Sequence, residues 1–557
     1  MKFKQGNPCL CICLTVKEGL IVLFTSYEFL AFFAVLLILY YVIPKRGQWM
    51  LLLAGSYIFY AFSGWTNLVF ILVTTLSTFI AARRIAFIKN SQGRGAKSWL
   101  VIALFLNLAI LFAVKFLDAG FSFWSFRGMD FVIPLGISFY MFQSLGYLID
   151  VYRGKYEPEK NLFRYALFVS FFPQLIQGPI SRFDDLKKTL FAEHKFDTNH
   201  ICRGLQRILW GFFKKLVIAN RLEIANEILF GDPSTYQGGY AFLGMLFYAL
   251  QLFADFTGGI DITIGIAQCF GIEVTENFIR PFFSKNIKEY WTRWHITMGS
   301  WFKDYVFYPL STSEMMLKLR RFSKKHFSPK IAKRVTVYVC TLVVWLATGI
   351  WHGVRPNYVV WGLLNGVIIL ISYELEPLYE KFRQWVNIHV YRESDLNAVN
   401  CADDLDTVNR VNAVNDVGNS CMKHTGYKIF QVIRTLLLMS CIRMLDCYKD
   451  VATTFWAFIS MFQPRKWNGF YTTIVEGLGE KNAFLGLGLK DYIVVLCGVF
   501  ILVIVSLFQR KASVREQIAC KKYPIRFAIW FLLFLLVVVF GVYGIGFEAT
   551  QFIYNQF

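Results

Sequence analysis

The stretch VTVYVCTLVVWLATGIWHG, residues 335–353, contains no Asp, Glu, Lys or Arg and is as long as a membrane-spanning helix. About 20 mainly apolar residues are needed to cross the roughly 30 Å hydrocarbon core of a bilayer as a helix. Runs of similar length and composition recur along the chain, at 21–43, 66–82, 98–116, 357–373, 429–446, 491–508 and 527–545. The sequence therefore predicts an all-α, multi-pass bundle in a cell membrane.

Composition agrees with this fold class. The 557 residues are 56% hydrophobic and 17% charged, whereas soluble domains carry about 25% charged residues. Further apolar runs are shorter or interrupted by glycine and polar residues, at 48–63, 131–149, 162–177 and 239–272. They raise the expected number of membrane elements to about 10–13, and we expect the interrupted ones to be buried in protein or to line a wet cavity.

The net charge of +21 reports membrane topology rather than nucleic-acid binding, because the basic residues lie in short segments between apolar runs. The segments 83–97, 318–334 and 510–526 are predicted to be cytoplasmic, which places the carboxyl-terminal tail outside. Residues 1–20 lack a signal-peptide cleavage pattern, and we expect no role for this extension. Residues 21–557 are read as one membrane domain, in which the polar, Asn-rich segment 387–425 is a flexible cytoplasmic insertion.

Two of the seven histidines lie in apolar surroundings. His295, in RWHITMGSW (293–301), falls on a helical stripe with Trp291, Trp294, Met298 and Phe302, so it is either a packed neutral imidazole or a proton acceptor. His352 is the second-last residue of the stretch quoted above and lies between Gly349 and Gly353, which allow close backbone approach. Ionisable side chains inside membranes are costly and usually functional, so the two histidines predict a site that uses a pair. No third ligand stands at metal-binding spacing beside either of them, and no metal is expected.

Buried carboxylates need partners. Asp255 and Asp261, in LFADFTGGIDITIG (252–265), should contact backbone amides, an arginine or water, and we expect them to close a broken helix rather than to catalyse. Asp150 and Arg153 stand three residues apart and predict an ion pair. The nucleophile elbow and the phosphate-binding loop motifs are missing from the sequence, which disfavours a hydrolase or a nucleotide-driven pump.

The motifs, taken in order, resemble the membrane-bound O-acyltransferase family in its bacterial alginate O-acetyltransferase branch. The matching stretches cover most of residues 22–557: LFTSYEFL, PLGISFYMFQSLGYLIDVYRG, FFPQLIQGPISR, LFADFTGGIDITIG, ENFIRPFFSKNIKEYWTRWHITMGSWFKDYVFYPL, TGIWHG and FIYNQF. The resemblance implies a curved bundle around a central funnel or tunnel, with His352 as the main catalytic residue and His295 in a supporting role. Eukaryotic relatives usually carry Asn at the position of His295.

The resemblance also implies the reaction. No cofactor is held permanently; acetyl-CoA or another acyl thioester is the cytoplasmic donor, and the acceptor is a cell-wall or exported polysaccharide. A histidine base would remove the proton of the attacking hydroxyl. The tail FIYNQF resembles an F-x-Y-x-x-F pattern, in which Tyr554 would carry the acyl group briefly to an extracellular or periplasmic transferase partner. An aromatic anchor at the membrane interface is the alternative for this tail.

Two other functions stay open at this stage. The first is D-alanyl transfer to teichoic acid, whose family members are typically shorter and lack their own F-x-Y tail. The second is a membrane transporter or lipid flippase, which would need no paired histidines and should show internal repeats.

Overall fold

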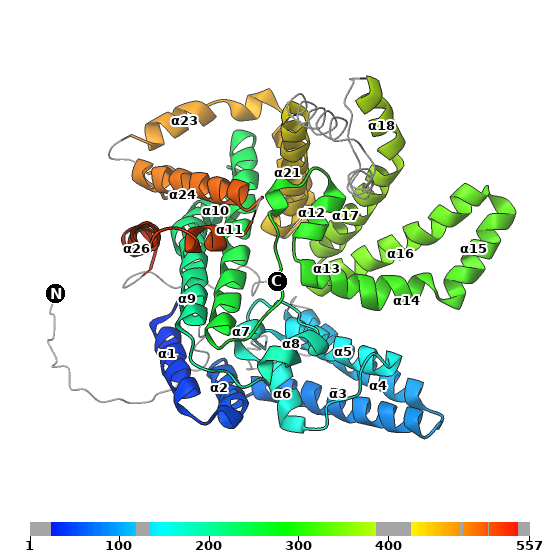
Figure 1. Ribbon diagram of the computed structural model, residues 1–557. Helices are drawn as coiled ribbons and strands as arrows, with labels where there is room; N and C mark the ends of the chain where they lie inside the picture. Colours follow the sequence, from blue (N-terminus) through cyan, green and yellow to red (C-terminus); the bar gives the residue numbers. More distant parts are fainter. Residues whose placement is uncertain (1–23, 119–133, 386–424, 480–482, 511, 544–557) are drawn as a thin grey trace, which may run out of the picture.

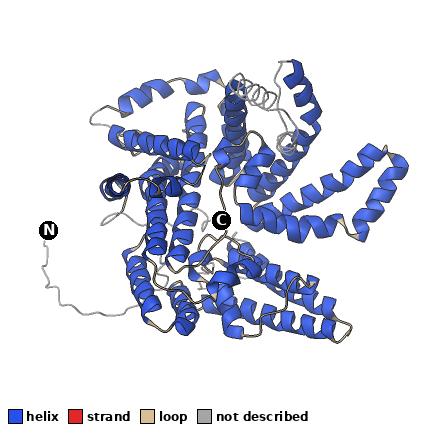
Figure 2. Cartoon of the chain, in the orientation of Figure 1, coloured by secondary structure: helices blue, strands red, loops and turns tan. Residues whose placement is uncertain are grey.

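The computed structural model describes residues 24–118, 134–385, 425–479, 483–510 and 512–543, and their regular elements are helices (Figures 1 and 2). The extension 1–20, nearly all of the 387–425 insertion and Tyr554 lie outside these residues.

The amino-terminal third forms one side of the molecule, at the bottom of Figure 1. Its helices are α1 (Tyr27–Val42), α2 (Gln48–Phe62), α3 (Asn67–Asn90), α4 (Ala96–Asp118), α5 (Ile137–Arg153), α6 (Leu162–Ser170), α7 (Phe172–Leu175) and α8 (Phe183–Leu190). The apolar run 162–177 is broken at Phe171 between α6 and α7. This break agrees with the expectation that the run is interrupted.

The middle of the chain supplies the centre of the molecule and the long arm at the right of Figure 1. Its helices are α9 (Thr198–Phe212), the π-helical turn η2 (Phe213–Ala219), α10 (Asn220–Gly231), α11 (Gly239–Cys269), the short turn η3 (Pro281–Phe283), α12 (Ile287–Arg293), α13 (Ile296–Phe302), the π-helical turn η4 (Lys303–Phe307), α14 (Tyr308–Ser311), α15 (Glu314–His326), α16 (Pro329–His352), α17 (Pro356–Glu374) and α18 (Glu376–Trp385).

The carboxyl-terminal helices cover the opposite side of the molecule. They are α21 (Thr425–Tyr448), α22 (Val451–Ser460), the turn η5 (Pro464–Trp467), α23 (Phe470–Gly477), α24 (Leu489–Phe508), α25 (Val514–Ala519) and α26 (Tyr523–Phe540). Helices α21, α23 and α24 lie at the top and upper left of Figure 1, and α26 lies at the left edge.

Seven helices of the described residues are long and apolar enough to cross a membrane: α3, α4, α11, α16, α17, α24 and α26. Helices α1 and α22 are apolar but shorter. The protein is therefore a multi-pass membrane protein. Several apolar runs expected to be membrane elements, such as 48–63 and 131–149, form helices below this length.

The run 239–272 was expected to be a broken helix, and this expectation is wrong. Helix α11 continues through all 31 residues from Gly239 to Cys269. Its glycines serve close packing instead: a Cβ at Gly265 would lie 2.7 Å from the carbonyl oxygen of Gly204, and one at Gly211 would lie 2.6 Å from that of Gly258. The two pairs are spaced by seven residues on each helix, so α9 and α11 approach each other along two turns.

The two carboxylates of α11 pair with cations from the chain beside it. Lys215 Nζ lies 2.5 Å from Asp255 Oδ1, and both side chains are 1% exposed. Asp261 accepts from Arg207 at 2.8 Å and from Lys214 at 2.5 Å. An arginine partner was among those expected for these carboxylates, and the lysine partners were not. Buried charges of this kind are tolerated only when they are paired.

Candidate functional site

His352 is the last residue of α16 and lies near a close contact between α16 and α17. A Cβ at Gly349 would lie 2.5 Å from the carbonyl oxygen of Tyr358, and one at Gly353 would overlap the Tyr358 ring. The close backbone approach predicted from these glycines is confirmed. The imidazole of His352 is buried against Trp351 and Trp361, with ring centroids 4.9 and 4.7 Å away.

His295 does not lie within a helix, and the predicted helical stripe is wrong. Helix α12 ends at Arg293, α13 begins at Ile296, and His295 between them has a left-handed backbone with φ of 50°. The cause is the extended segment beside it. The backbone N–H of Ile296 donates to Asn277 O at 3.0 Å, so the backbone bonds across to this segment and leaves the helical ladder.

Asn277 also fixes the side chains at this break. Its Oδ1 accepts from the N–H of Thr297 at 3.1 Å and from its hydroxyl at 2.9 Å, and it lies 3.3 Å from His295 Nδ1. The imidazole of His295 is 0% exposed and packs against Phe256, with centroids 5.1 Å apart. Trp351 lies 6.1 Å from the same imidazole. Trp351 therefore contacts both histidines, and the structure brings the two predicted site residues together around it.

Arg443 on α21 is a site residue that the sequence analysis missed. Its guanidinium lies 4.8 Å from the centre of the Trp294 ring and 5.6 Å from that of Trp361, and it pairs with Asp446 at 3.1 Å. It is a positive neighbour of both imidazoles. The signal was present in MSCIRMLDCY (439–448), where an arginine and an aspartate stand three apart in an apolar run.

A second cation reaches the site from α4. Lys115 Nζ donates to the backbone oxygen of His352 at 3.2 Å, and its side chain is buried. This contact holds the end of α16 from the amino-terminal side of the molecule. Lys115 also stands inside an apolar run, so its signal in the sequence was of the same kind as that of Arg443.

His295 lies outside the candidate spans, in the connection between α12 and α13. Burial, followed by the charge of Arg443, lowers the pKa of its imidazole to about 3. The imidazole is therefore neutral at physiological pH.

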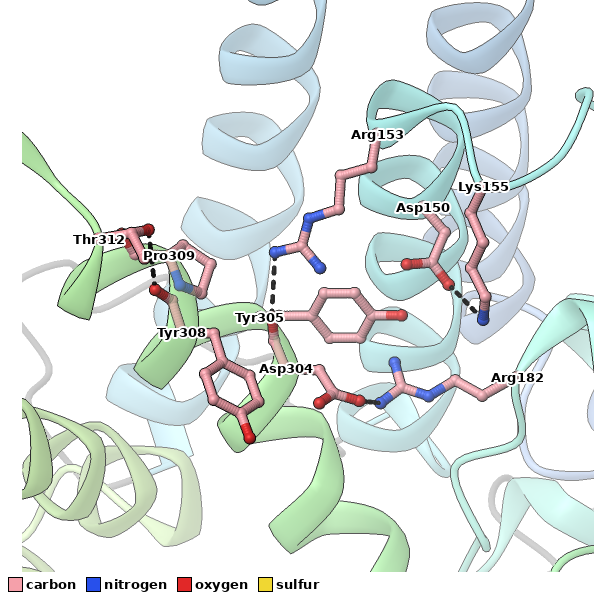
Figure 3. A pocket seen from close by; sticks show the side chains of 9 residues that line it. All are labelled: Asp150, Arg153, Lys155, Arg182, Asp304, Tyr305, Tyr308, Pro309 and Thr312. Atoms are coloured by element: carbon pink, nitrogen blue, oxygen red, sulfur yellow. Dashed lines mark hydrogen bonds and ion pairs between the residues drawn. The ribbon is translucent and has the colours of Figure 1, made fainter.

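A polar cavity of about 610 Å³ opens beside the end of α5 (Figure 3). Three cations face it, from Arg153, Lys155 and Arg182, together with Asp150 and Asp304. The ion pair predicted between Asp150 and Arg153 is wrong. The chain turns at Gly154, whose φ is 76°, and this returns Lys155 to within 3.5 Å of Asp150, while Arg153 donates to the backbone oxygen of Asp304 at 3.0 Å.

A row of aromatic rings leads from this cavity to the histidines. Tyr305 lines the cavity and lies 5.2 Å from Trp301. Trp301 stacks on Phe142 at 3.9 Å, and Phe142 lies 5.4 Å from Trp351. Four packed rings, those of Tyr305, Trp301, Phe142 and Trp351, thus lie between the cavity and the imidazoles.

The fold and site define a multi-pass helical membrane protein that buries two imidazoles beside a cation. Residues 159–324 match the model of the membrane-bound O-acyltransferase family. Over 63% of this chain, a probable alginate O-acetylase AlgI from Azotobacter vinelandii is 33% identical, with 68% of its own length covered. A peptidoglycan O-acetyltransferase from Helicobacter pylori is 28% identical over 60% of this chain and 66% of its own length. A teichoic acid D-alanyltransferase from Bacillus subtilis is 30% identical over 45% of this chain and 62% of its own length.

The chain spans about two thirds of the length of the curated relatives it matches. It belongs to the membrane-bound O-acyltransferase family.

Proposed function

We propose that this protein moves an acyl group from a cytoplasmic thioester to a hydroxyl of a cell-wall or exported polysaccharide, and that the acyl group is acetyl. The observation that carries the proposal is the pair of buried imidazoles in contact with Trp351 and beside the Arg443 cation. The names of the relatives support acetyl as the acyl group and a polysaccharide as the acceptor.

In the proposed reaction, His352 is the general base. Its imidazole takes the proton of the acceptor hydroxyl while the hydroxyl oxygen bonds to the thioester carbonyl carbon. The carbon–sulfur bond then breaks, and the imidazolium returns the proton to the departing thiolate. Negative charge develops on the carbonyl oxygen in between, and Arg443 is the cation placed to stabilise it in a site of low dielectric. His295 supports the geometry, because Asn277 and Trp351 fix its imidazole.

The polar cavity of Figure 3 is the proposed donor entrance. Lys89 Nζ donates to the backbone oxygen of Tyr152, and this contact ties the end of α5 to the basic segment 83–97, which is predicted to be cytoplasmic. Arg153, Lys155 and Arg182 would meet the phosphates of a coenzyme A or carrier-bound thioester. The tunnel implied by the family resemblance would then follow the aromatic row from Tyr305 to Trp351.

His352→Ala tests the proposal directly. Loss of the base should lower transfer of labelled acetate, and the acetyl content of the polysaccharide, by about 10² or more. His326→Ala is the matched control, because His326 is exposed on α15 and bonds only to its own helix at Phe322 O. Acetyl transfer by His352→Ala at the level of the control would contradict the proposed mechanism with His352 as the general base.

Delivery outside the membrane is assigned to a separate transferase, with Tyr554 as the acyl relay. Tyr554→Phe removes the oxygen that would form the acyl ester. Without this acceptor the labelled acetyl group should stay on the thioester donor, and the acetyl content of the polysaccharide should fall to the level without the partner. Normal acetylation by Tyr554→Phe would leave the tail as an aromatic anchor and would not affect the role of His352.

The two alternatives have weaker support. The match to the D-alanyltransferase covers a smaller share of this chain than the matches to the acetyltransferases. Labelled D-alanine in place of acetate in the same assay separates these two reactions. Family membership and the buried histidine pair argue against a transporter.

A further inference from the structure

A second cavity of about 610 Å³ lies apart from the histidines, between the central helices α9 and α11 and the last long helices α24 and α26. One end is lined by charged side chains and the other by apolar ones. In Figure 1, α24 and α26 lie beside α9, α10 and α11 at the left of the molecule.

Most charges at the polar end neutralise one another. Arg207 Nε lies 2.8 Å from Asp261, and its two terminal nitrogens each lie 2.6 Å from an oxygen of Glu276. Lys214 lies 2.5 Å from the other oxygen of Asp261. Two cations and two carboxylates thus form a closed network with no net charge.

Two further cations line the same end, Arg280 and Arg515. Arg515 donates to neutral acceptors, Gln268 Oε1 at 3.2 Å and Arg203 O at 3.3 Å. Among the residues that the structure describes, neither guanidinium forms an ion pair with a carboxylate. Burial, followed by the neighbouring charge of Arg207, lowers the pKa of Arg515. The cavity therefore has two positive charges that its own walls do not neutralise.

The other end is apolar over the length of several helical turns. Ile501, Leu502 and Val505 line it from α24, and Leu533 and Leu536 line it from α26. Only 17% of α24 and 11% of α26 is buried within the protein, so both helices border the bilayer. Arg515 belongs to the segment 510–526, which is predicted to be cytoplasmic. The charged end then lies at the level of the headgroups of the inner leaflet.

We propose that this cavity binds one anionic glycerophospholipid, with its phosphate at Arg280 and Arg515 and its acyl chains along α24 and α26. Basic pockets between membrane helices on the cytoplasmic side hold anionic headgroups in this way. Acetyl-coenzyme A also carries phosphates, on its coenzyme A part, but its acetyl group is too short to cover the apolar wall of the cavity. The site is separate from the histidines and does not depend on the proposed reaction.

Native mass spectrometry of the purified full chain in detergent tests this proposal. Dioleoyl phosphatidylglycerol should bind with higher occupancy than dioleoyl phosphatidylcholine. The double variant Arg280→Gln/Arg515→Gln should weaken phosphatidylglycerol binding by about tenfold or more, since charge-assisted contacts to phosphate are lost. Lys521→Gln is the matched control, because Lys521 is an exposed cation of the same segment that does not line the cavity.

A second pair of variants tests the apolar end with all charges in place. Val505→Trp fills the cavity and should lower phosphatidylglycerol occupancy, whereas Leu507→Trp, at an exposed position of α24 outside the cavity, should not. If the arginine variants do not fold, these two tryptophan variants still test whether the lipid binds in the cavity. Equal occupancy of the two lipids, unchanged binding by Val505→Trp, or displacement of the lipid by coenzyme A would overturn the proposal.

Discussion

His295 occupies a backbone position that few side chains adopt, since non-glycine residues rarely have positive φ. Asn is enriched in this left-handed region, and Asn is also the residue that eukaryotic members of the family usually carry here. In this chain the imidazole places Nδ1 3.3 Å from Asn277 Oδ1. We expect the property needed at this position to be a fixed hydrogen bond rather than a titrating group.

Substitution of His295 separates a positioning role from proton transfer. His295→Asn should retain acyl transfer within about tenfold of the unmodified protein, whereas His295→Ala should lose about 10², because the end of α16 shifts when the bond to Asn277 is lost. Initial rates with labelled donor measure the difference. Equal and severe loss in both variants would show that the imidazole itself takes part in the chemistry.

The same variant tests the electrostatics of the site. The pKa of His295 is about 3 in the folded protein, below the ordinary 6.5. Below pH 6.5 the unfolded chain takes up a proton that the folded protein does not, so folding stability falls as pH falls, by at most about 1.4 kcal/mol per pH unit. Thermal unfolding midpoints at pH 7.5 and pH 5 should therefore diverge between the unmodified protein and His295→Asn, with the variant less sensitive to acid. Parallel midpoints would contradict the burial of a neutral imidazole.

At the scale of elements, the contact between α9, η2 and α11 depends on a π-helical turn. Lys214 and Lys215 are adjacent in sequence, yet they reach carboxylates six residues apart on α11, Asp261 and Asp255. A regular helix would direct adjacent side chains about 100° apart, and the wider turn of η2 places both against one neighbour. Such turns have no marker in the apolar pattern, so the lysine partners could not be predicted.

Removal of one member of the Lys215–Asp255 pair should be costly. Asp255→Asn leaves a buried ammonium without its carboxylate and should destabilise the fold by about 3–5 kcal/mol. The double variant Lys215→Met/Asp255→Leu should recover most of this loss. Asp185→Asn is the control, since its pair with Lys188 is exposed and worth less than about 1 kcal/mol. The stability of the three variants and the unmodified protein is compared by the fraction that stays folded after heating in detergent, measured by size-exclusion chromatography. Equal heat resistance of Asp255→Asn and Asp185→Asn would contradict a stabilising role of the buried pair.

The sequence predicted elements best where apolar residues alone determine them. The run 357–373 becomes α17 (Pro356–Glu374) to within one residue at each end, and the run 335–352 becomes the carboxyl-terminal three quarters of α16, which starts six residues earlier at Pro329. Prediction failed where a polar side chain or a glycine has a partner far away in sequence. The run 239–272 was expected to be broken, but its Gly265 packs on α9 within a continuous helix, and His295 was expected to be helical but is held by Asn277. Only the folded chain shows these partners.

At the scale of the whole molecule, the donor entrance and the lipid site both depend on which side of the membrane the basic segments face. The contact of Lys89 with the backbone of Tyr152 connects the segment 83–97 to the cavity of Figure 3. Arg515 connects the segment 510–526 to the second cavity. If the segments 83–97 and 510–526 face the cytoplasm, both cavities receive their ligands from the inner side of the membrane. Acceptors then reach His352, near the outer end of α16, from the outer side.

This orientation can be measured at a native residue. Cys520 is exposed within 510–526, so in a variant that keeps it as the only cysteine, a membrane-impermeant maleimide should label inside-out vesicles and spare intact spheroplasts. Arg355→Cys in a cysteine-free background gives the opposite control, since Arg355 is exposed just after α16 and should react only from outside. The reverse pattern would place both cavities outside. A cytoplasmic thioester would then have no route to Tyr305, and the proposed direction of transfer would fail even if His352 proved to be the base.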